Sequence, residues 1–117
     1  MKQALLTLVS LLLASAVQAQ TCNPSSIQKT KPDSRYELLS GGAEVKDKKT
    51  GLIWQRCPLG MSWNGTTCAG TATPYNWENA LAQAATEATN TSKPWRLPNL
   101  KELKSLVETA CYGQAIN

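Results

Sequence analysis

Apolar residues recur at helical spacing twice in the second half of the chain. Each recurrence follows an asparagine, Asn76 or Asn99, and asparagine is a preferred residue at helix N-termini. Glu102 completes a capping box with Asn99. The pattern predicts two amphipathic helices, each with one buried apolar face. The apolar positions are Trp77, Ala80, Leu81, Ala84, Ala85 and Ala88 in the first helix, and Leu100, Leu103, Leu106, Val107 and Ala110 in the second. The polar positions predicted to face solvent on the second helix are Lys101, Lys104, Ser105 and Glu108.

Shorter apolar runs in the first half predict strands over residues 36–39, 43–47 and 52–56. Residues 48–51 separate the last two runs and predict a β-hairpin, in which Gly51 takes a positive φ. In the last strand Leu52 and Trp54 are expected on one face, and Ile53 and Gln55 on the other. Residues 57–73 are rich in turn-forming residues and show no periodicity, so they are predicted to form an irregular loop.

Residues 1–19 have the pattern of a signal peptide. Lys2 precedes an apolar run over residues 4–14, and Val17-Gln18-Ala19 fits the small-residue rule for cleavage after Ala19. The apolar run is too short to cross a bilayer. We therefore expect an exported protein, located in the periplasm or at the extracellular cell surface, with no transmembrane segment. The polar residues 20–35 are expected to form an N-terminal arm.

Four cysteines remain after this cleavage: Cys22, Cys57, Cys68 and Cys111. An even number of cysteines in a small exported chain predicts two disulfides. Three pairings are compatible with the count, and the sequence does not choose between them. The turn-rich segment between Cys57 and Cys68 favours a local bridge there, which would leave Cys22 to pair with Cys111. A metal site is not expected, because the chain contains no C-x-x-C pair and no histidine.

Two groups of residues are candidates for ligand binding. Lys46, Lys48 and Lys49 surround one turn, with Arg56 nearby in the sequence, and the formal net charge is +4. They form either a solvated turn or a patch for acidic glycans or an anionic surface. Trp63 lies among turn-forming residues and either covers a disulfide or stacks on a sugar or partner. Nucleic acid is not an expected partner, since the excess charge is small and the chain is exported.

Residues suited to catalysis are scarce. Without histidine, neither a Ser-His-Asp nor a Cys-His arrangement is available within the chain. The chain also lacks a phosphate-binding glycine loop, and its few carboxylates are scattered along the sequence. We therefore expect no enzyme activity and no cofactor.

Three sequence blocks resemble a known family when they are taken together and in order. They are Val45-x-Asp47-x-x-Thr50-Gly51-Leu52-x-Trp54-Gln55-Arg56-Cys57, Trp77-x-x-Ala80-Leu81 and Trp95-Arg96-Leu97-Pro98-Asn99-x-x-Glu102-Leu103-x-Ser105-Leu106-Val107. This combination resembles the Lcl C-terminal domain family, a bacterial domain of unknown function. The resemblance implies a C-type-lectin-like α+β fold over residues 36–117 and a role in adhesion or glycan binding. Members normally continue beyond this point with a W-S-S segment and further strands, so the C-terminal half of the domain is expected to be missing.

The sequence thus predicts a small antiparallel sheet with two helices and two disulfides. The expected function is that of an exported, non-catalytic binding or adhesion module, with an extracellular glycan or cell-surface molecule as partner. One alternative is a structural module or truncated gene product with no ligand. Another is a remote relative of the formylglycine-generating enzyme, whose fold shares the Arg96-Leu97-Pro98 segment.

Overall fold

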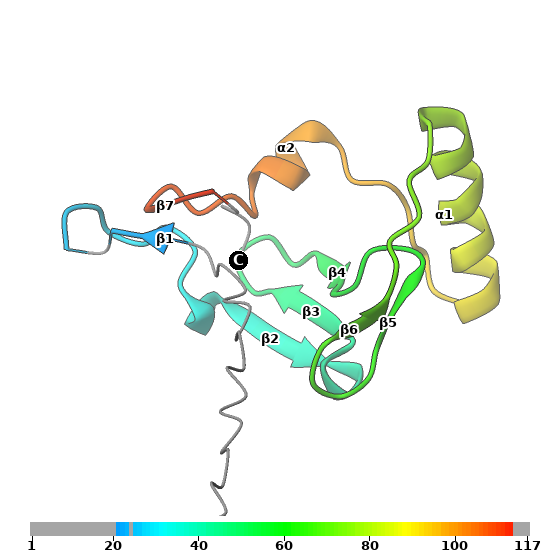
Figure 1. Cartoon of the computed structure of the whole chain (residues 1–117), viewed down its shortest axis with the longest axis horizontal. Helices are drawn as coiled ribbons and strands as arrows, with labels where there is room; N and C mark the ends of the chain where they lie inside the picture. Colours follow the sequence, from blue (N-terminus) through cyan, green and yellow to red (C-terminus); the bar gives the residue numbers. More distant parts are fainter. Residues whose placement is uncertain (1–20, 24, 114–117) are drawn as a thin grey trace, which may run out of the picture.

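The computed structural model describes residues 21–23 and 25–113. Within them, three small antiparallel sheets and two helices make up an α+β arrangement (Figure 1). The signal peptide predicted for residues 1–19 and the chain end at residues 114–117 lie outside the described residues.

The central sheet has the strand order β2 (Tyr36–Leu39), β3 (Glu44–Asp47) and β4 (Ile53–Gln55). Short 3₁₀ turns at Asp33–Arg35 and Ser40–Gly42 flank β2. Gly51 has a φ of 75° in the turn between β3 and β4. Trp54 is paired with Val45, and Ile53 with Lys46, so the predicted hairpin is confirmed.

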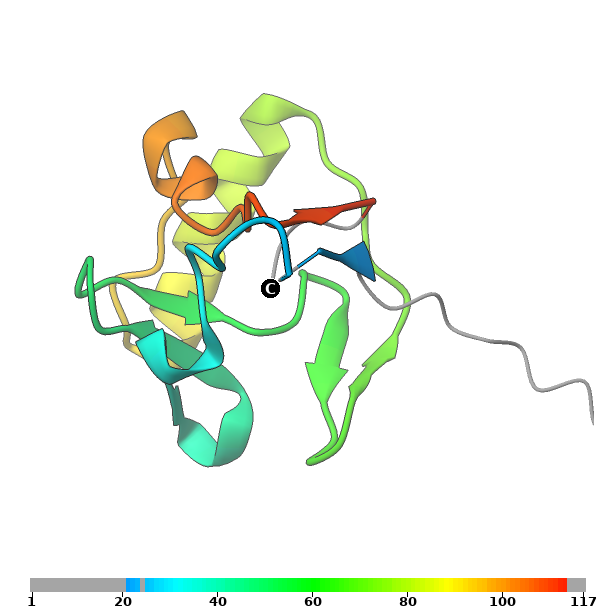
Figure 2. The same cartoon turned by 90° about the vertical axis from the view of Figure 1, so that its left-hand side faces the viewer.

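A second hairpin lies where the sequence predicted an irregular loop. It consists of β5 (Met61–Trp63) and β6 (Cys68–Gly70), and Figure 2 shows it beside the central sheet. The Asn64 side-chain oxygen accepts hydrogen bonds from the backbone N–H groups of Thr66 and Thr67, both at 2.9 Å, which closes the turn. The loop prediction was wrong because three-residue strands are too short to display a period of two.

The two ends of the described chain pair with each other. β1 (Thr21–Cys22) runs antiparallel to β7 (Cys111–Tyr112), and the two strands lie side by side in Figure 2. A disulfide joins Cys22 to Cys111, and a second joins Cys57 to Cys68. Both bridges, and the pairing that the local loop favoured, are therefore confirmed. The predicted arm is fixed to the opposite end of the chain.

Helix α1 (Trp77–Thr91) begins where the sequence predicted. The Asn76 side chain accepts a hydrogen bond from the Asn79 N–H at 2.9 Å. The predicted burial of its apolar stripe is wrong in part: no residue of α1 is fully buried, Ala85 is exposed, and at the N-terminal end Trp77 is 70% exposed and Leu81 is 48% exposed. No other element of the described chain covers these two side chains enough to exclude solvent.

Helix α2 (Leu100–Lys104) is shorter than predicted. Its capping box between Asn99 and Glu102 is confirmed, but the helix ends before the apolar positions at 106–110. Leu100, predicted to be buried, is 73% exposed, whereas Glu108, predicted to face solvent, is 2% exposed. The prediction is thus wrong at Leu100, at Leu103 (44% exposed) and at Glu108, whose carboxylate is bound by the backbone of residues 30 and 31, whereas Lys101 and Lys104 are exposed and Ala110 is buried as predicted.

The interior of the described chain is unusually polar. Ala110 is the hydrophobic residue that is fully buried there, together with the carboxylates of Asp47 and Glu108. Among the described residues, no helix has the length and apolar character needed to span a membrane. Hydrogen bonds and disulfides therefore carry much of the organisation that an apolar core provides in larger domains.

Candidate functional site

An open cavity of about 670 Å³ lies beside the central sheet, and we call it the apolar lobe. It is bounded by β4, the middle of α1 and the extended segment 93–98, three parts that lie far apart in the sequence. Asn76 caps the start of α1, and Pro98 ends the extended segment before α2. These two residues therefore determine where two walls of the lobe lie. The apolar side chains in its lining are Leu52, Ile53, Trp54, Leu59, Ala84, Pro94, Trp95, Leu97 and Pro98.

A second hollow of about 410 Å³ adjoins the first, and we call it the polar lobe. It lies between the end of β4, the β5–β6 hairpin and the C-terminal half of α1. The two lobes share Glu44, Gln55, Leu59, Glu87 and Trp95. The polar lobe adds Ser62, Trp63 and Thr91, so its wall combines two indole rings with carboxylate, amide and hydroxyl groups.

The charged groups around the lobes are largely paired with one another. Lys93 forms an ion pair with Glu44, and Arg96 forms one with Glu102. Hydrogen bonds from Arg96 and from the Asn99 N–H lower the pKa of Glu102 to about 2. Glu87 instead accepts a hydrogen bond from the neutral Gln55 side chain at 2.9 Å. The linings thus hold three carboxylates and two cations, which gives them a slight negative excess.

Two tryptophan N–H groups beside the apolar lobe have no acceptor. The Nε1 atoms of Trp54 and Trp95 are buried and lack a hydrogen-bond partner among the described residues. A buried donor without a partner costs about 1–3 kcal/mol. Both rings line the apolar lobe, while their two N–H groups are buried and unsatisfied among the described residues.

Trp63, a candidate from the sequence, is anchored in the wall of the polar lobe. Its Nε1 donates to the Gly41 carbonyl at 3.0 Å, and the Arg56 guanidinium stacks on its ring at 3.9 Å from the centroid. Arg56 also donates to the Gly42 carbonyl at 3.3 Å. The structure thus brings together two of the predicted site residues, and Trp63 covers the backbone at residues 41–42 while also facing the hollow.

The predicted lysine patch lies away from both lobes. Lys46 is on β3, opposite Glu37 on one side and Ile53 on the other. Lys48 and Lys49 are exposed in the turn that follows β3. None of the three lines either lobe. Their role in binding acidic glycans stays a prediction for a separate surface.

Four lining residues were not predicted as site residues from the sequence: Trp54, Trp95, Glu44 and Glu87. Trp54 and Trp95 stood in the sequence blocks that indicated the fold, and Glu44 and Glu87 stood in predicted secondary structure. No spacing rule connects a strand at 53–55, a helix at 77–91 and a segment at 93–98. Only the three-dimensional arrangement of these elements brings the four side chains together.

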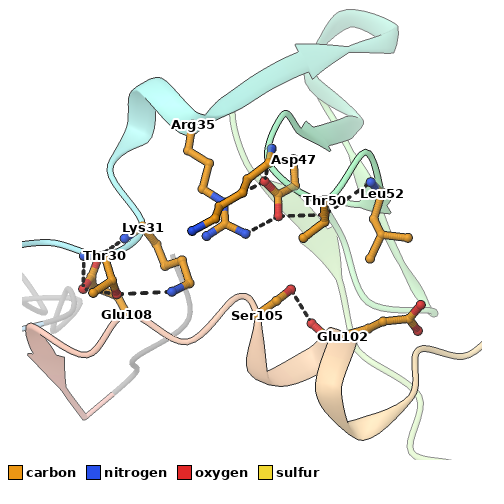
Figure 3. A network of polar contacts seen from close by, with 10 residues as sticks. Thr30, Lys31, Arg35, Asp47, Thr50, Leu52, Glu102, Ser105 and Glu108 are labelled. Carbon is orange, nitrogen blue, oxygen red and sulfur yellow. Dashed lines mark hydrogen bonds and ion pairs between the residues drawn. The ribbon is translucent and has the colours of Figure 1, made fainter.

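The carboxylate of Asp47 is enclosed by donors (Figure 3). It forms an ion pair with Arg35, whose Nε lies 2.6 Å from Oδ1. It also accepts from the Lys49 N–H at 2.9 Å and from the Thr50 hydroxyl at 2.8 Å. The Arg35 hydrogen bonds hold the pKa of Asp47 well below its usual range, although burial opposes this shift. The side chain fixes the turn between β3 and β4.

Glu108 is held in a similar way at the other end of the network in Figure 3. It accepts from the backbone N–H groups of Thr30 at 2.9 Å, Lys31 at 2.6 Å and Ala110 at 2.9 Å. Burial by itself would raise the pKa of Glu108, but these backbone hydrogen bonds outweigh it and lower the pKa to about 2. Glu108 thus fastens the N-terminal arm to residues 108–111. We call this group of contacts, together with the Cys22–Cys111 bridge, the clasp.

Metal-binding groups are absent from the part of the chain that the structure describes, where no cluster of three or more histidine, cysteine, aspartate or glutamate side chains occurs. All four cysteines are taken up by the disulfides. The described side chains therefore offer hydrogen-bonding and apolar contacts at the lobes.

Comparison with known families gives a match to the Lcl C-terminal domain over residues 43–117, more than half of the chain. The chain belongs to the Lcl C-terminal domain family. Comparisons with curated proteins and with solved structures gave no match. Every residue that lines the two lobes falls within the Lcl C-terminal domain, whereas β1, the arm and β2 precede the matched residues.

Proposed function

We propose that this Lcl C-terminal domain is an exported, non-catalytic binding module that takes a glycan in the polar lobe and serves adhesion to an extracellular or cell-surface partner. The observation that carries the proposal is the composition of that lobe, in which Trp63 and Trp95 stand beside Glu87 and Gln55. Two disulfides support an oxidising location outside the cytoplasm. A C-type-lectin-like fold is part of the same proposal and rests on the family.

The polar lobe has the mixed chemistry that a sugar requires. A pyranose ring presents apolar C–H faces that pack on indole rings, and its hydroxyl groups need acceptors and donors at its edge. Glu87 and Gln55 supply a carboxylate and an amide, and Ser62 and Thr91 supply hydroxyls. The slight negative excess of the lining favours a neutral sugar over a sulfated or uronic one.

The state of the carboxylates supports a non-catalytic role. Glu44 and Glu102 are engaged by Lys93 and Arg96. Asp47 and Glu108 are buried and saturated with donors, and their pKa values lie below the ordinary range. General acid catalysis needs a carboxyl whose pKa is raised toward the working pH. Asp47, Glu102 and Glu108 are instead held ionised, because hydrogen bonds lower the pKa of each of these carboxyl groups.

The test is a glycan array probed with the mature, oxidised protein and three variants. Glu87→Gln keeps the side-chain shape and removes the carboxylate, so binding of a neutral glycan should fall about tenfold. Trp63→Phe keeps a ring in the wall but loses the bond to Gly41, and it should bind more tightly than Trp63→Ala. The control is Lys48→Glu combined with Lys49→Glu, which should leave this binding unchanged.

Two outcomes would contradict the proposal. One is the absence of any glycan signal from protein whose thermal unfolding is cooperative. The other is binding that only the lysine variant removes and that weakens steeply with salt on a heparin column, which would assign the function to the Lys46, Lys48 and Lys49 turn. Equal loss of binding and of melting temperature in Trp63→Ala would assign Trp63 a structural role.

A further inference from the structure

The polar lobe contains a carboxylate that no cation of the described chain neutralises. Glu44 and Glu87 are the charged side chains in its lining, where the described residues contribute no lysine or arginine. Lys93 forms its ion pair with Glu44 from the lining of the adjoining apolar lobe. Glu87 has a neutral hydrogen-bond partner instead, the Gln55 side chain at 2.9 Å. The negative charge of Glu87 is therefore left unbalanced at the wall of the lobe.

The polar side chains of the lining offer more acceptors than donors. The Gln55 amide donates to one Glu87 oxygen, so the second Glu87 oxygen remains able to accept. The Thr91 hydroxyl donates to the backbone carbonyl of Glu87 at 2.7 Å, which removes it as a donor to a ligand. The polar side-chain donors that remain are the second N–H of Gln55 and the Ser62 hydroxyl. A ligand group that brings several donors therefore matches this lining best.

The two indole rings of the lobe favour a positive charge as well as a sugar face. A cation is attracted to the face of a tryptophan ring. Arg56 makes such a contact with Trp63 and is not part of the lining, whereas no cation of the described chain lies over Trp95. The Trp63 N–H donates to the Gly41 carbonyl, and the Trp95 N–H is buried. The rings therefore offer a ligand their faces and not their donors.

A protonated amine on a sugar ring meets all three of these demands. An ammonium group carries a full positive charge and three donors, and it has no acceptor that needs a partner. An N-acetyl group in the same position is neutral and adds a carbonyl, for which the lining has few donors. The ammonium of a lysine side chain stands at the end of an apolar stem. It would leave Ser62 and Gln55 unmatched, whereas the hydroxyls of an amino sugar reach both kinds of group.

We propose that the polar lobe selects glycans that contain an amino sugar with an unacetylated, protonated amine, which forms an ion pair with Glu87 beside the ring of Trp95. This inference rests on the proposed function, because it specifies the glycan that the same lobe takes. It ranks the sugars by one substituent: the free amine binds most tightly, and the hydroxyl and the N-acetyl group bind less tightly. Glu87 is the residue that determines this order.

The experiment compares three oligosaccharides of the same length and linkage that differ at one position of each ring. They are built from glucosamine, N-acetylglucosamine or glucose, and isothermal titration calorimetry measures their binding to the mature, oxidised protein. The measurement is made at a mildly acidic pH, at which the sugar amine is protonated. The glucosamine oligomer should bind about tenfold more tightly than the glucose oligomer, because a hydrogen bond to a charged group replaces a neutral one. The N-acetylated oligomer should bind no more tightly than the glucose oligomer.

Two variants test the charge of the lobe by different routes. Glu87→Gln should weaken binding of the glucosamine oligomer about a hundredfold and of the glucose oligomer about tenfold, so that the preference disappears. Glu44→Gln keeps Glu87 but leaves the Lys93 ammonium without its ion pair beside the lobe, and it should reduce the preference by about threefold. Glu78→Gln is the matched control, because it makes the same change at an exposed position of α1 outside the lining. It should keep the preference of the parent.

The outcomes separate this inference from the proposed function. Equal affinity for the three oligosaccharides would overturn the selection of an amine and leave a glycan-binding lobe in place. A preference for the amine that persists in Glu87→Gln would also overturn it, since the amine would then bind elsewhere. Absence of binding to all three sugars would contradict both proposals. A short lysine-containing peptide that binds as tightly as the glucosamine oligomer would assign the lobe to an amine without a sugar.

Discussion

The clasp and the lobes distribute polar and apolar side chains in opposite ways. In the clasp, the Glu108 carboxylate is buried against backbone N–H groups, beside the fully buried Ala110 and the Cys22–Cys111 bridge. Around the lobes, the lining residue Ile53 is 45% exposed, and at the starts of α1 and α2, outside both linings, Trp77 and Leu100 are 70% and 73% exposed. Both regions belong to one small chain, and only the clasp is closed.

The difference indicates where stability resides and where binding capacity resides. A saturated buried carboxylate is costly to disturb, because breaking its contacts leaves a charge without partners. An exposed apolar side chain contributes little to folding, but it can contribute to association once it is covered. We therefore expect substitutions in the clasp and its disulfide to affect unfolding, and substitutions at the lobes to affect ligands.

The largest effect is expected from the disulfide of the clasp. Cys22→Ser combined with Cys111→Ser should lower the free energy of unfolding by roughly 4.5 kcal/mol, because the bridge closes a long loop. Cys57→Ser combined with Cys68→Ser is the matched control and should cost roughly 3 kcal/mol. The sequence separations are 89 and 11 residues. Urea titration measures both values, and a larger loss from the shorter bridge would contradict the ranking.

The second largest loss of unfolding free energy is expected from substitution of Asp47. Asp47→Ala leaves the buried Arg35 guanidinium without its ion pair and frees the donors of Lys49 and Thr50. The expected loss is about 3 kcal/mol, again measured by urea titration. Glu78→Gln, an exposed carboxylate in the first turn of α1, should change the same quantity by about 0.5 kcal/mol or less. Equal effects would mean that burial of the ion pair is unimportant.

Acid should open the clasp in a defined pH range. The pKa of Glu108 is lowered to about 2 in the folded protein, so its contribution is present above its ordinary pKa and is lost as the pH falls. The part of the stability that Glu108 supplies should therefore decline from about pH 4.5 and level off near pH 2. Glu102 adds to the loss over the same range, and Asp47, whose pKa is held lower still, extends it below that range. Glu108→Gln should make this decline shallower in urea midpoints measured at pH 7, 4.5 and 2.5. An unchanged slope would show that the backbone hydrogen bonds do not lower the pKa of Glu108 in the folded protein.

The smallest effect is expected at the exposed start of α2. Leu100→Gln replaces a side chain that is 73% exposed, so the free energy of unfolding should change by about 0.5 kcal/mol or less. Thermal unfolding at neutral pH measures this change. A loss as large as that of Asp47→Ala would show that the apolar surface is already covered in solution.

The same contrast explains which parts of the structure could be predicted from the sequence. The hairpin at Gly51 and the caps at Asn76 and Asn99 were predicted correctly, because turn and cap residues act through their own neighbours. The disulfides followed from their number and from the local loop. Periodicity identified the apolar faces at Trp77 and Leu100, but it cannot tell whether another element covers them. Glu108 was wrongly predicted to face solvent, because the residues that bind its carboxylate, 30 and 31, lie far away in the sequence.

The lobes could not be predicted for a related reason. Trp54, Glu87 and Trp95 belong to a strand, a helix and an extended segment, and their meeting depends on how those elements pack. Trp63 was singled out because it interrupts a run of turn residues, and it does reach the polar lobe. Sequence patterns thus indicated Trp63, and the other residues of the site could be identified only from the tertiary structure.

The bond between Cys22 and Cys111 also makes the described chain a covalent ring. Asn23 follows Cys22 and Ala110 precedes Cys111, and the Asn23 N–H donates to the Ala110 carbonyl at 2.9 Å. A backbone hydrogen bond thus supports the disulfide that closes the ring. The Cys57–Cys68 bond forms a smaller ring within the larger one. A protease that cuts once anywhere between Cys22 and Cys111 therefore opens the ring without releasing a fragment. Outside the cytoplasm, such a molecule remains in one piece after a first cut and loses a segment only after a second cut or reduction.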